Sequence, residues 1–224
     1  MQISEILDRI NTAKSKAFRT DKIFFVGVSK NHSVDKIKFA ENYIDFFGEN
    51  RVQEAQNKIL NYGPCKVSWR LIGHLQQNKA RKAMEIFSSI DSLDSIELAN
   101  KLNNLAIEFN KIMPVLIEVN TSGEINKSGI TPENFYKLLD HVVTLENLKL
   151  NGLMTVGPLT DDDTKIHKSF ELLRNLTEQA RIKTGLELPI ISMGMSDDFE
   201  TAIYEGSTMI RIGTLLFGER DYKK

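Results

Sequence analysis

Eight short apolar runs are spaced along the 224-residue chain, and each is followed by a stretch in which apolar residues recur at helical spacing. The first run, residues 23–30 (IFFVGVSK), is apolar at almost every position, which is typical of a strand buried on both faces. No two-residue turn of the β-hairpin type joins one run to the next, so the pattern predicts parallel strands connected by helices. The predicted strands cover residues 23–30, 44–48, 68–73, 85–91, 113–120, 148–157, 188–194 and 207–213.

Two folds built from parallel strand–helix units fit this pattern, a closed (β/α)8 barrel and an open doubly wound sheet. Eight units is the number found in a barrel. A dinucleotide-binding sheet would carry a G-x-G-x-x-G turn after its first strand, and here that turn reads SKNHSV. We therefore predict an α/β fold, a single TIM barrel domain over residues 1–224. An extra N-terminal helix is expected at residues 2–18, and a helix at residues 33–42.

Charge and cysteine content exclude several classes of protein. Lys and Arg number 29 against 30 Asp and Glu, so the chain lacks the basic excess of a nucleic-acid or anionic-membrane binder. The single cysteine, Cys65, excludes an intrachain disulfide and a cysteine-based zinc site. The longest apolar run, residues 23–28, is too short to span a membrane, and Glu5 and Asp8 do not fit a signal peptide. We expect a soluble cytoplasmic protein without a metal.

A lysine at the end of the first predicted strand is the most unusual residue of the expected site. Active sites of (β/α)8 barrels lie at the C-terminal ends of the strands. Lys30 should therefore point into the barrel mouth, where partial desolvation favours the neutral amine that forms Schiff bases. A lysine at a strand end can equally extend to solvent. Position alone leaves both interpretations open.

The seventh and eighth units supply groups suited to a phosphate. The run GSTMIRIGT puts Gly213 and Thr214 at the start of a final short helix, and Ser196 follows the seventh strand. Barrels commonly hold a phosphate with these two loops, although glycine, serine and threonine are also ordinary turn residues. Together with Lys30, these residues indicate a pocket for an aldehyde that carries a phosphate, such as pyridoxal 5′-phosphate. A sugar-phosphate aldolase would present the same parts.

Several longer motifs resemble those of one family. FFVGVSK, FGENRVQEAQNK, WRLIGHLQQNK, IEVNTSGEINKSGI, GLMTVG and SMGMSDDFETAIYEGSTMIRIGTLLFG occur in order between about Ile23 and Tyr222. They closely resemble the pyridoxal phosphate homeostasis proteins, the YggS/PROSC family. The resemblance implies a barrel similar to the N-terminal domain of alanine racemase. It also implies that pyridoxal phosphate is held on the lysine matching Lys30, without established catalytic turnover.

The resemblance also suggests roles for individual residues. Lys30 would carry the cofactor as a Schiff base, and Arg211 would face the pyridine nitrogen, where an arginine disfavours the protonated, electron-accepting ring. Lys127 would approach the phenolic oxygen. The other expected contacts are Ser196, Gly213 and Thr214 to the phosphate, Ser192 as a weaker phosphate candidate, Asn50 and Met154 beside the ring, and His74 on the third loop without an essential proton-transfer role.

Two classes of function remain after these assignments. The first is a non-catalytic carrier of pyridoxal phosphate for intracellular vitamin B6 homeostasis, with cofactor-dependent apoenzymes as recipients. The second is an enzyme with weak racemase- or transaminase-like activity, or a Schiff-base aldolase. Racemisation needs acid–base groups on both faces of the substrate carbon, and a chain ending at Lys224 has no room for the second domain that supplies one in the racemase. We expect the carrier, acting as a monomer.

Overall fold

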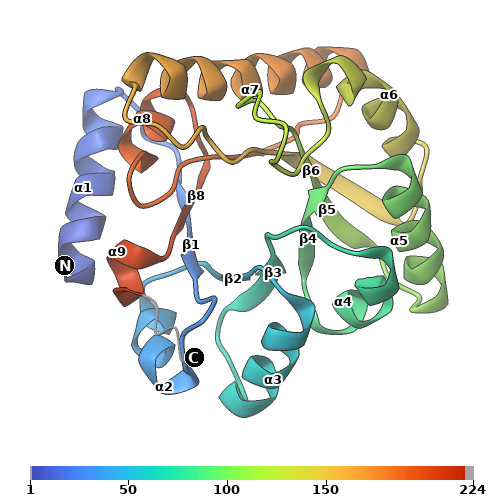
Figure 1. Ribbon diagram of the computed structural model, residues 1–224, viewed down its shortest axis with the longest axis horizontal. Coiled ribbons are helices and arrows are strands. Elements are labelled where there is room, and N and C mark those ends of the chain that lie inside the picture. The colour runs from blue at the N-terminus through green and yellow to red at the C-terminus, as the bar shows by residue number, and fades with distance from the viewer. Residues whose placement is uncertain (1, 220–224) are drawn as a thin grey trace.

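Within residues 2–219, which the computed structural model describes, eight parallel strands close into a barrel, β1 to β8 in chain order (Figure 1). Met1 and residues 220–224, and so Tyr222 at the end of the resemblance, lie outside the described residues. Closure is direct, because β8 pairs with β1 in register from Phe24↔Met209 to Gly27↔Ile212. The predicted barrel is confirmed. The strands are β1 Phe24–Val28, β2 Phe46–Glu49, β3 Ser68–Leu71, β4 Ser89–Leu93, β5 Met113–Glu118, β6 Leu148–Met154, β7 Ile190–Ser192 and β8 Met209–Ile212.

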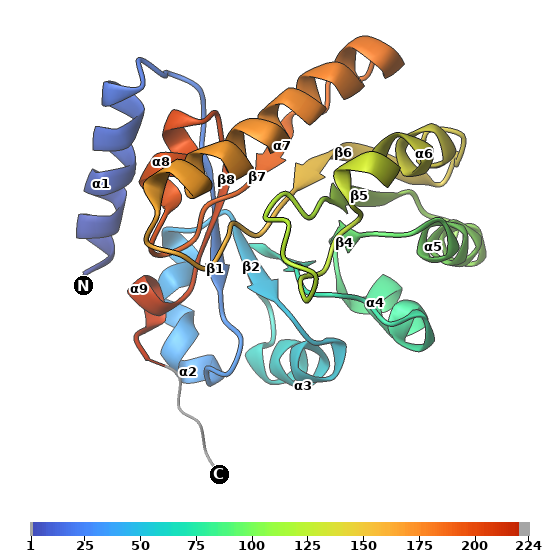
Figure 2. The ribbon, with the colours of Figure 1, turned by 45° about the horizontal axis from the view of Figure 1, so that its top comes forward.

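Helices form a ring outside the strands, which the tilted view in Figure 2 shows clearly. The predicted extra helix is α1, and it lies beside α8, where Arg9 and Glu200 form an ion pair at 2.7 Å. The α-helices are α1 Ile3–Lys16, α2 Val34–Ile37, α3 Val52–Tyr62, α4 Ala80–Ile86, α5 Ile96–Glu108, α6 Pro132–Val142, α7 Asp163–Thr184, α8 Phe199–Tyr204 and α9 Thr214–Phe217. Two 3₁₀ helices, η1 Lys38–Asn42 and η2 Gln77–Lys79, complete the ring.

Some predicted boundaries are wrong. The strand expected at 85–91 is β4 at Ser89–Leu93, because residues 85 and 86 form the last turn of α4. A short apolar run does not distinguish a helix end from a strand, which explains the error. The helix expected at 33–42 is split into α2 and η1. Strand β1 ends at Val28, so Lys30 lies in the turn that follows it.

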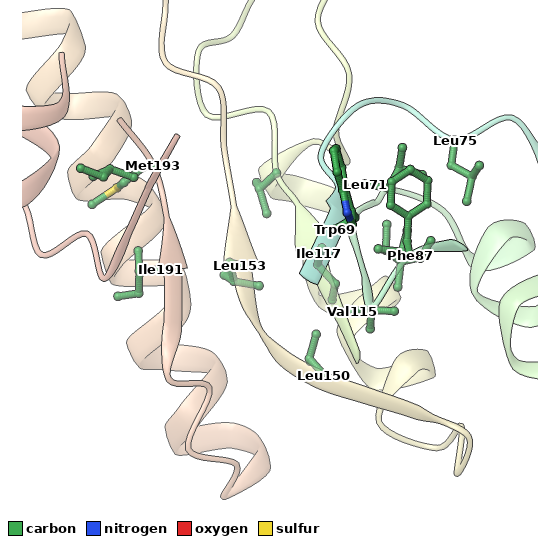
Figure 3. Close-up of a cluster of buried hydrophobic side chains, with 14 of the residues drawn as sticks. Trp69, Leu71, Leu75, Phe87, Val115, Ile117, Leu150, Leu153, Ile191 and Met193 are labelled. Atoms are coloured by element: carbon green, nitrogen blue, oxygen red, sulfur yellow. The ribbon is translucent and has the colours of Figure 1, made fainter. Parts of the chain in front are cut away.

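The layer between strands and helices is apolar. Trp69 on β3 stacks on Phe47 of β2 with ring centroids 4.6 Å apart, and Tyr62 of α3 meets both rings edge-on. Figure 3 shows part of this layer, in which Trp69, Leu71 and Phe87 lie on one side and Ile191 and Met193 on the other. Burial of this surface supplies the main driving force for folding.

The inside of the barrel is mixed in character. Five apolar side chains form a small cluster there, namely Val26, Leu116, Met154, Ile190 and Met209. The buried Arg70 guanidinium binds the Asp91 carboxylate through two hydrogen bonds of 2.7 and 2.8 Å, and the Ser89 hydroxyl donates to the same carboxylate. The barrel interior therefore combines apolar side chains with a buried ion pair.

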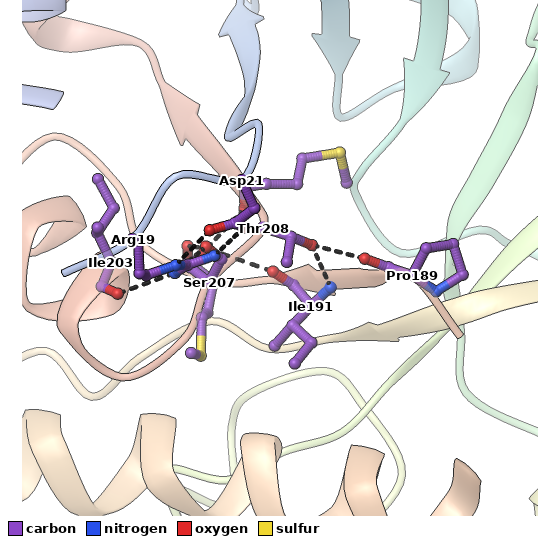
Figure 4. Close-up of polar contacts among 9 residues, drawn as sticks. Arg19, Asp21, Pro189, Ile191, Ile203, Ser207 and Thr208 are labelled. Carbon is purple, nitrogen blue, oxygen red and sulfur yellow. Dashed lines mark hydrogen bonds and ion pairs between the residues drawn. The ribbon is translucent and has the colours of Figure 1, made fainter. Parts of the chain in front are cut away.

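Polar contacts connect several segments at the end of the barrel where the strands begin (Figure 4). Arg19, in the segment before β1, donates to the carbonyls of Ile203 and Ser207 and pairs with Asp21. Thr208 donates from its hydroxyl to the Pro189 carbonyl. These contacts join the entry to β1 to the connection between β7 and β8. In the part of the chain that the structure describes, no helix is both long and apolar enough to cross a membrane.

Candidate functional site

A cavity of about 300 Å³ lies at the C-terminal ends of the strands, which is near the lower limit for small-molecule sites. It is bordered by residues that follow or end β1, β2, β3, β6, β7 and β8. Six of the residues expected in the site line it: Lys30, Asn50, Ser196, Arg211, Gly213 and Thr214. The other lining residues, which were not among the expected contacts, are Val28, Ile72, Val156, Met195 and Asp197.

The loops after β7 and β8 are connected at one wall of the cavity. The Ser196 hydroxyl accepts a hydrogen bond of 3.3 Å from the Leu215 backbone in α9. Asp198 accepts one of 2.6 Å from the Met195 N–H and so holds the loop after β7 in shape. At Gly213 a Cβ would lie 3.2 Å from the Val28 carbonyl oxygen, so glycine allows the two backbones to approach. This wall presents hydroxyl and backbone groups of the kind that bind phosphate.

Arg211 projects from β8 beneath the cavity and is almost fully buried. Its two terminal nitrogens donate to the Ser192 hydroxyl and to the Thr155 carbonyl, each at 2.7 Å. Burial lowers the pKa of the Arg211 guanidinium, and the carboxylates of Glu118, Asp198 and Asp91 oppose that shift. Ser192 is itself buried and outside the cavity lining, so its observed contact is with Arg211.

Glu118, the last residue of β5, is a buried acid that the sequence analysis did not consider. Burial raises its pKa from the ordinary 4.5 to about 7, while nearby Arg211 acts in the opposite direction. Its Oε2 atom is buried and has no hydrogen-bond partner among the described residues. The signal was available, because Glu118 is the only charged residue in the apolar run MPVLIEV. A titrating group therefore lies beside the arginine that closes the bottom of the site.

Lys30 is half-buried and lines the cavity from the turn after β1, the strand that pairs with β8. The turn is closed by a hydrogen bond of 3.1 Å from the His32 N–H to the Ser29 carbonyl. Asn31 takes a left-handed backbone conformation with φ of 61°. The lysine amine and the phosphate-type groups thus border a single cavity.

Besides Ser192, three more residues expected at the site are absent from the cavity lining, namely Met154, His74 and Lys127. Met154 belongs to the interior cluster, and Val156 lines the cavity instead. His74 lines a neighbouring cavity of about 360 Å³, and its Nδ1 atom lies 2.9 Å from the Asp94 carboxylate. Lys127 donates to the Gly157 carbonyl at 2.6 Å and pairs with Glu124.

A larger cavity of about 470 Å³ lies at the other end of the barrel. It is lined by residues near the starts of β6 and β7, including Leu148 and Pro189. Catalytic and ligand sites of this fold occur at the C-terminal ends of the strands, so size alone does not identify the functional cavity. No group of three or more His, Cys, Asp or Glu side chains within residues 2–219 is placed to hold a metal ion.

Comparison with known proteins gives a consistent result. The family model of the alanine racemase N-terminal domain matches residues 3–221. A pyridoxal phosphate homeostasis protein of Aquifex aeolicus is 40% identical over 223 residues, covering 99% of this chain and 98% of that protein. Another of that name from Synechocystis is 41% identical over 199 residues, covering 87% of this chain and 90% of its own length.

Solved structures agree with the sequence relatives. PipY of Synechococcus elongatus with pyridoxal phosphate bound superposes with a TM-score of 0.83 at 34% identity, covering 97% of this chain and all of that one (100%). An alanine racemase of Clostridium difficile gives a TM-score of 0.77 at 17% identity, with 100% of this chain and 59% of the racemase covered. At that identity the racemase supports the fold alone.

Proposed function

The chain belongs to the family of pyridoxal phosphate homeostasis proteins, built on the alanine racemase N-terminal domain, and from that premise we propose that it holds pyridoxal 5′-phosphate on Lys30 without catalytic turnover. The observation that supports this proposal most directly is that Lys30 borders the same cavity of about 300 Å³ as Ser196, Gly213 and Thr214. The lysine amine can react with an aldehyde, and the hydroxyl and backbone groups in the same cavity can bind a phosphate, so the cavity suits a phosphorylated aldehyde. The proposal treats residues 1–224 as one cofactor-binding domain.

The residues present fit this cofactor. Gly213 leaves space that a side chain would fill against Val28, which allows close approach of a phosphate to the backbone. Asn50 lines the cavity, and its Oδ1 atom is buried without a hydrogen-bond partner among the described residues. A ligand donor would satisfy that atom. Ile72 and Val156 add apolar surface on which a planar ring can pack.

Each side chain has a distinct role in the proposed complex. The neutral Lys30 Nζ adds to the aldehyde carbon; a C=N bond forms, and one water molecule leaves, so that hydrolysis reverses the attachment. Ser196, Thr214 and the Gly213 backbone hold the phosphate. Arg211 would face the pyridine nitrogen, where its cation would disfavour a proton on that atom. The cofactor itself supplies the reactive aldehyde.

The remaining expected contacts stay proposals. For Lys127 to reach the phenolic oxygen, its ammonium must leave the Gly157 carbonyl. Met154 would lie beside the ring, Ser192, which contacts Arg211, would be a weaker phosphate contact, and His74 would border the neighbouring cavity. We further propose that the protein is a cytoplasmic monomer that passes the cofactor to apoenzymes.

The placement of Arg211 and the scarcity of acid–base groups support a carrier. Besides Lys30, the ionisable side chains lining the cavity are Asp197, which is exposed, and Arg211. Racemisation requires an acid–base group on each face of the substrate carbon, and transamination requires a ring that accepts electrons. An enzyme with weak racemase- or transaminase-like activity, or an aldolase, is the alternative that the experiment below distinguishes.

The test compares the wild type with Lys30→Ala. After addition of pyridoxal phosphate, we expect the wild type to gain visible absorbance, and borohydride reduction followed by peptide mapping to find the adduct on Lys30. Lys30→Ala should lack both. Amino acids should then cause no exchange of the substrate α-proton with deuterated solvent; rapid exchange would favour the enzyme, and a wild type without an adduct would refute cofactor binding.

A further inference from the structure

Both residues that flank Lys30 in the chain are held by one buried ion network. The Ser29 hydroxyl donates to Glu49 at 2.6 Å, and the Ser29 carbonyl accepts from the Lys58 ammonium at 2.6 Å. On the other side of Lys30, the Asn31 N–H donates to Glu54. We call Ser29, Glu49, Glu54 and Lys58 the Lys58 network. It contacts the backbone immediately before and immediately after the proposed cofactor lysine.

Lys58 is at the centre of this network. It projects from α3, and only 6% of its side chain is exposed. Its ammonium donates to the Ser29 carbonyl, to Glu49 and, at 3.0 Å, to Glu54. A lysine ammonium has three N–H groups, so these contacts use its whole donor capacity. Lys58 is therefore tied to its partners and does not compete with Lys30 for an aldehyde.

Stability does not explain why such a network is buried here. The Glu49 side chain is fully buried; burial raises its pKa, Lys58 opposes the shift, and its Oε2 atom has no hydrogen-bond partner among the described residues. Well-packed apolar side chains of similar size commonly stabilise a protein as well as a buried ion pair does. Departures from favourable local chemistry concentrate at functional sites. The neighbouring left-handed Asn31 is a second such departure.

The network also reaches the cavity through β2. Glu49 is the last residue of β2, and Asn50, which lines the cavity, follows it directly. Lys58 and Glu49 therefore link the Lys30 turn to the segment that bears Asn50. Two walls of the cavity are connected behind the surface that a ligand would touch.

We propose that Lys58 is a positioning residue that, with Glu49 and Glu54, fixes the turn carrying Lys30 and so determines how long the cofactor stays attached to that lysine. This inference rests on the proposed function, because it concerns the same lysine. When the network is lost, the Ser29 carbonyl and the Asn31 N–H lose their partners and the turn is free to shift. Small displacements of a reacting group have large effects on rate.

The test uses Lys58→Met, which keeps the length of the side chain and removes the ammonium. Lys82→Met is the matched control, since it also removes one lysine, here from an exposed pair with Glu85 on α4. We expect pyridoxal phosphate to leave Lys58→Met about tenfold faster than the wild type or the control. Borohydride mapping at limiting cofactor should show adducts spreading from Lys30 to other lysines. Lys58→Arg, which retains the cation and its donors, should restore part of the wild-type rate.

If Lys58 only stabilises the fold, a different result is expected. Lys58→Met would then lower the melting temperature, but the release rate and the labelled lysine would be unchanged at a temperature where circular dichroism shows the variant folded. If Lys58→Met does not fold, Glu54→Gln decides the question, because it weakens the contact to Asn31 at the more exposed edge of the network. Wild-type release and labelling in these variants would overturn the positioning role, whereas a wild type with no adduct on Lys30 would instead refute the proposed function.

Discussion

The inside of the barrel and the layer outside its strands differ in the share of buried charged side chains that they contain. Outside, side chains such as Phe47, Trp69 and Phe135 form an apolar layer beneath the helices, which the Lys58 network interrupts between β2 and α3. Inside, five apolar side chains share the space with the Arg70–Asp91 pair, Glu118 and Arg211. The contrast indicates that the outer layer supplies stability, and that the interior gives up part of it to support the site.

The largest effect on stability should come from the outer layer. Phe135 on α6 is completely buried, and Phe135→Ala should lower the free energy of unfolding by about 3–5 kcal/mol through lost burial and a new cavity. Pyridoxal phosphate binding should persist at a temperature where the variant is folded. Urea unfolding measures the change in stability, and visible absorbance measures cofactor binding. Loss of binding in a fully folded variant would contradict the idea that the outer layer supplies stability and the interior supports the site.

Breaking the interior ion pair should lower the free energy of unfolding by a little less, and removing the second charge as well should restore most of the loss. Arg70→Met leaves the Asp91 carboxylate buried without its guanidinium and should destabilise by about 3 kcal/mol. The double variant Arg70→Met/Asp91→Leu removes both charges, and we expect it to regain most of that loss. A double-mutant cycle in urea provides the measurement, and simple additivity of the two losses would refute the idea that this pair is replaceable.

The interior should also make stability depend on pH through Glu118. Between pH 4.5 and about 7 the folded protein keeps a proton on Glu118 that the unfolded chain has released. The free energy of unfolding should therefore fall as pH rises through this window, by about 3 kcal/mol at 1.36 kcal/mol per pH unit, and change no further above it. Glu118→Gln should remove this contribution. If the free energy of unfolding changed with pH in the same way in the wild type and the variant over pH 5–8, the contribution of Glu118 would be excluded.

The smallest effect is expected at the surface of the barrel mouth. Lys127 joins the loop after β5 to the Gly157 carbonyl in the loop after β6, and both it and its partner Glu124 are partly exposed. Lys127→Ala should lower the free energy of unfolding by less than about 1 kcal/mol. Pyridoxal phosphate should nevertheless be released more slowly, because a cation near the phenolic oxygen aids exchange of the attached amine. Unchanged release kinetics would show that Lys127 does not act on the cofactor.

The sequence predicted the fold and grouped several residues that line one cavity, for a physical reason. Parallel strands place their C-terminal ends at one end of a barrel, so Lys30, Arg211 and Thr214 could be brought together from strand order alone. Which residues of β5 and β6 face inward could not be predicted in the same way. Their pairing is irregular between Val115 and Leu116, and a one-residue shift reverses which side chains face inward.

Loop residues set a second limit on prediction. His74 follows β3 and was expected at the site, yet it turns towards Asp94 in the neighbouring cavity. Alternation along a strand does not determine the direction of a side chain once the strand has ended. The Lys58 network was missed for a related reason, because its members are in the turn after β1, at the end of β2 and on α3, and only packing brings them together.

The pairing of β8 with β1 has a consequence for synthesis of the protein on the ribosome. The amine of the proposed site follows the first strand, and the phosphate-type groups follow the last two. Contacts between such distant parts of a chain form late, after the intervening loop entropy has been lost. While β8 is still inside the ribosome, the nascent chain has the lysine but no pocket around it. Cofactor capture must therefore follow barrel closure.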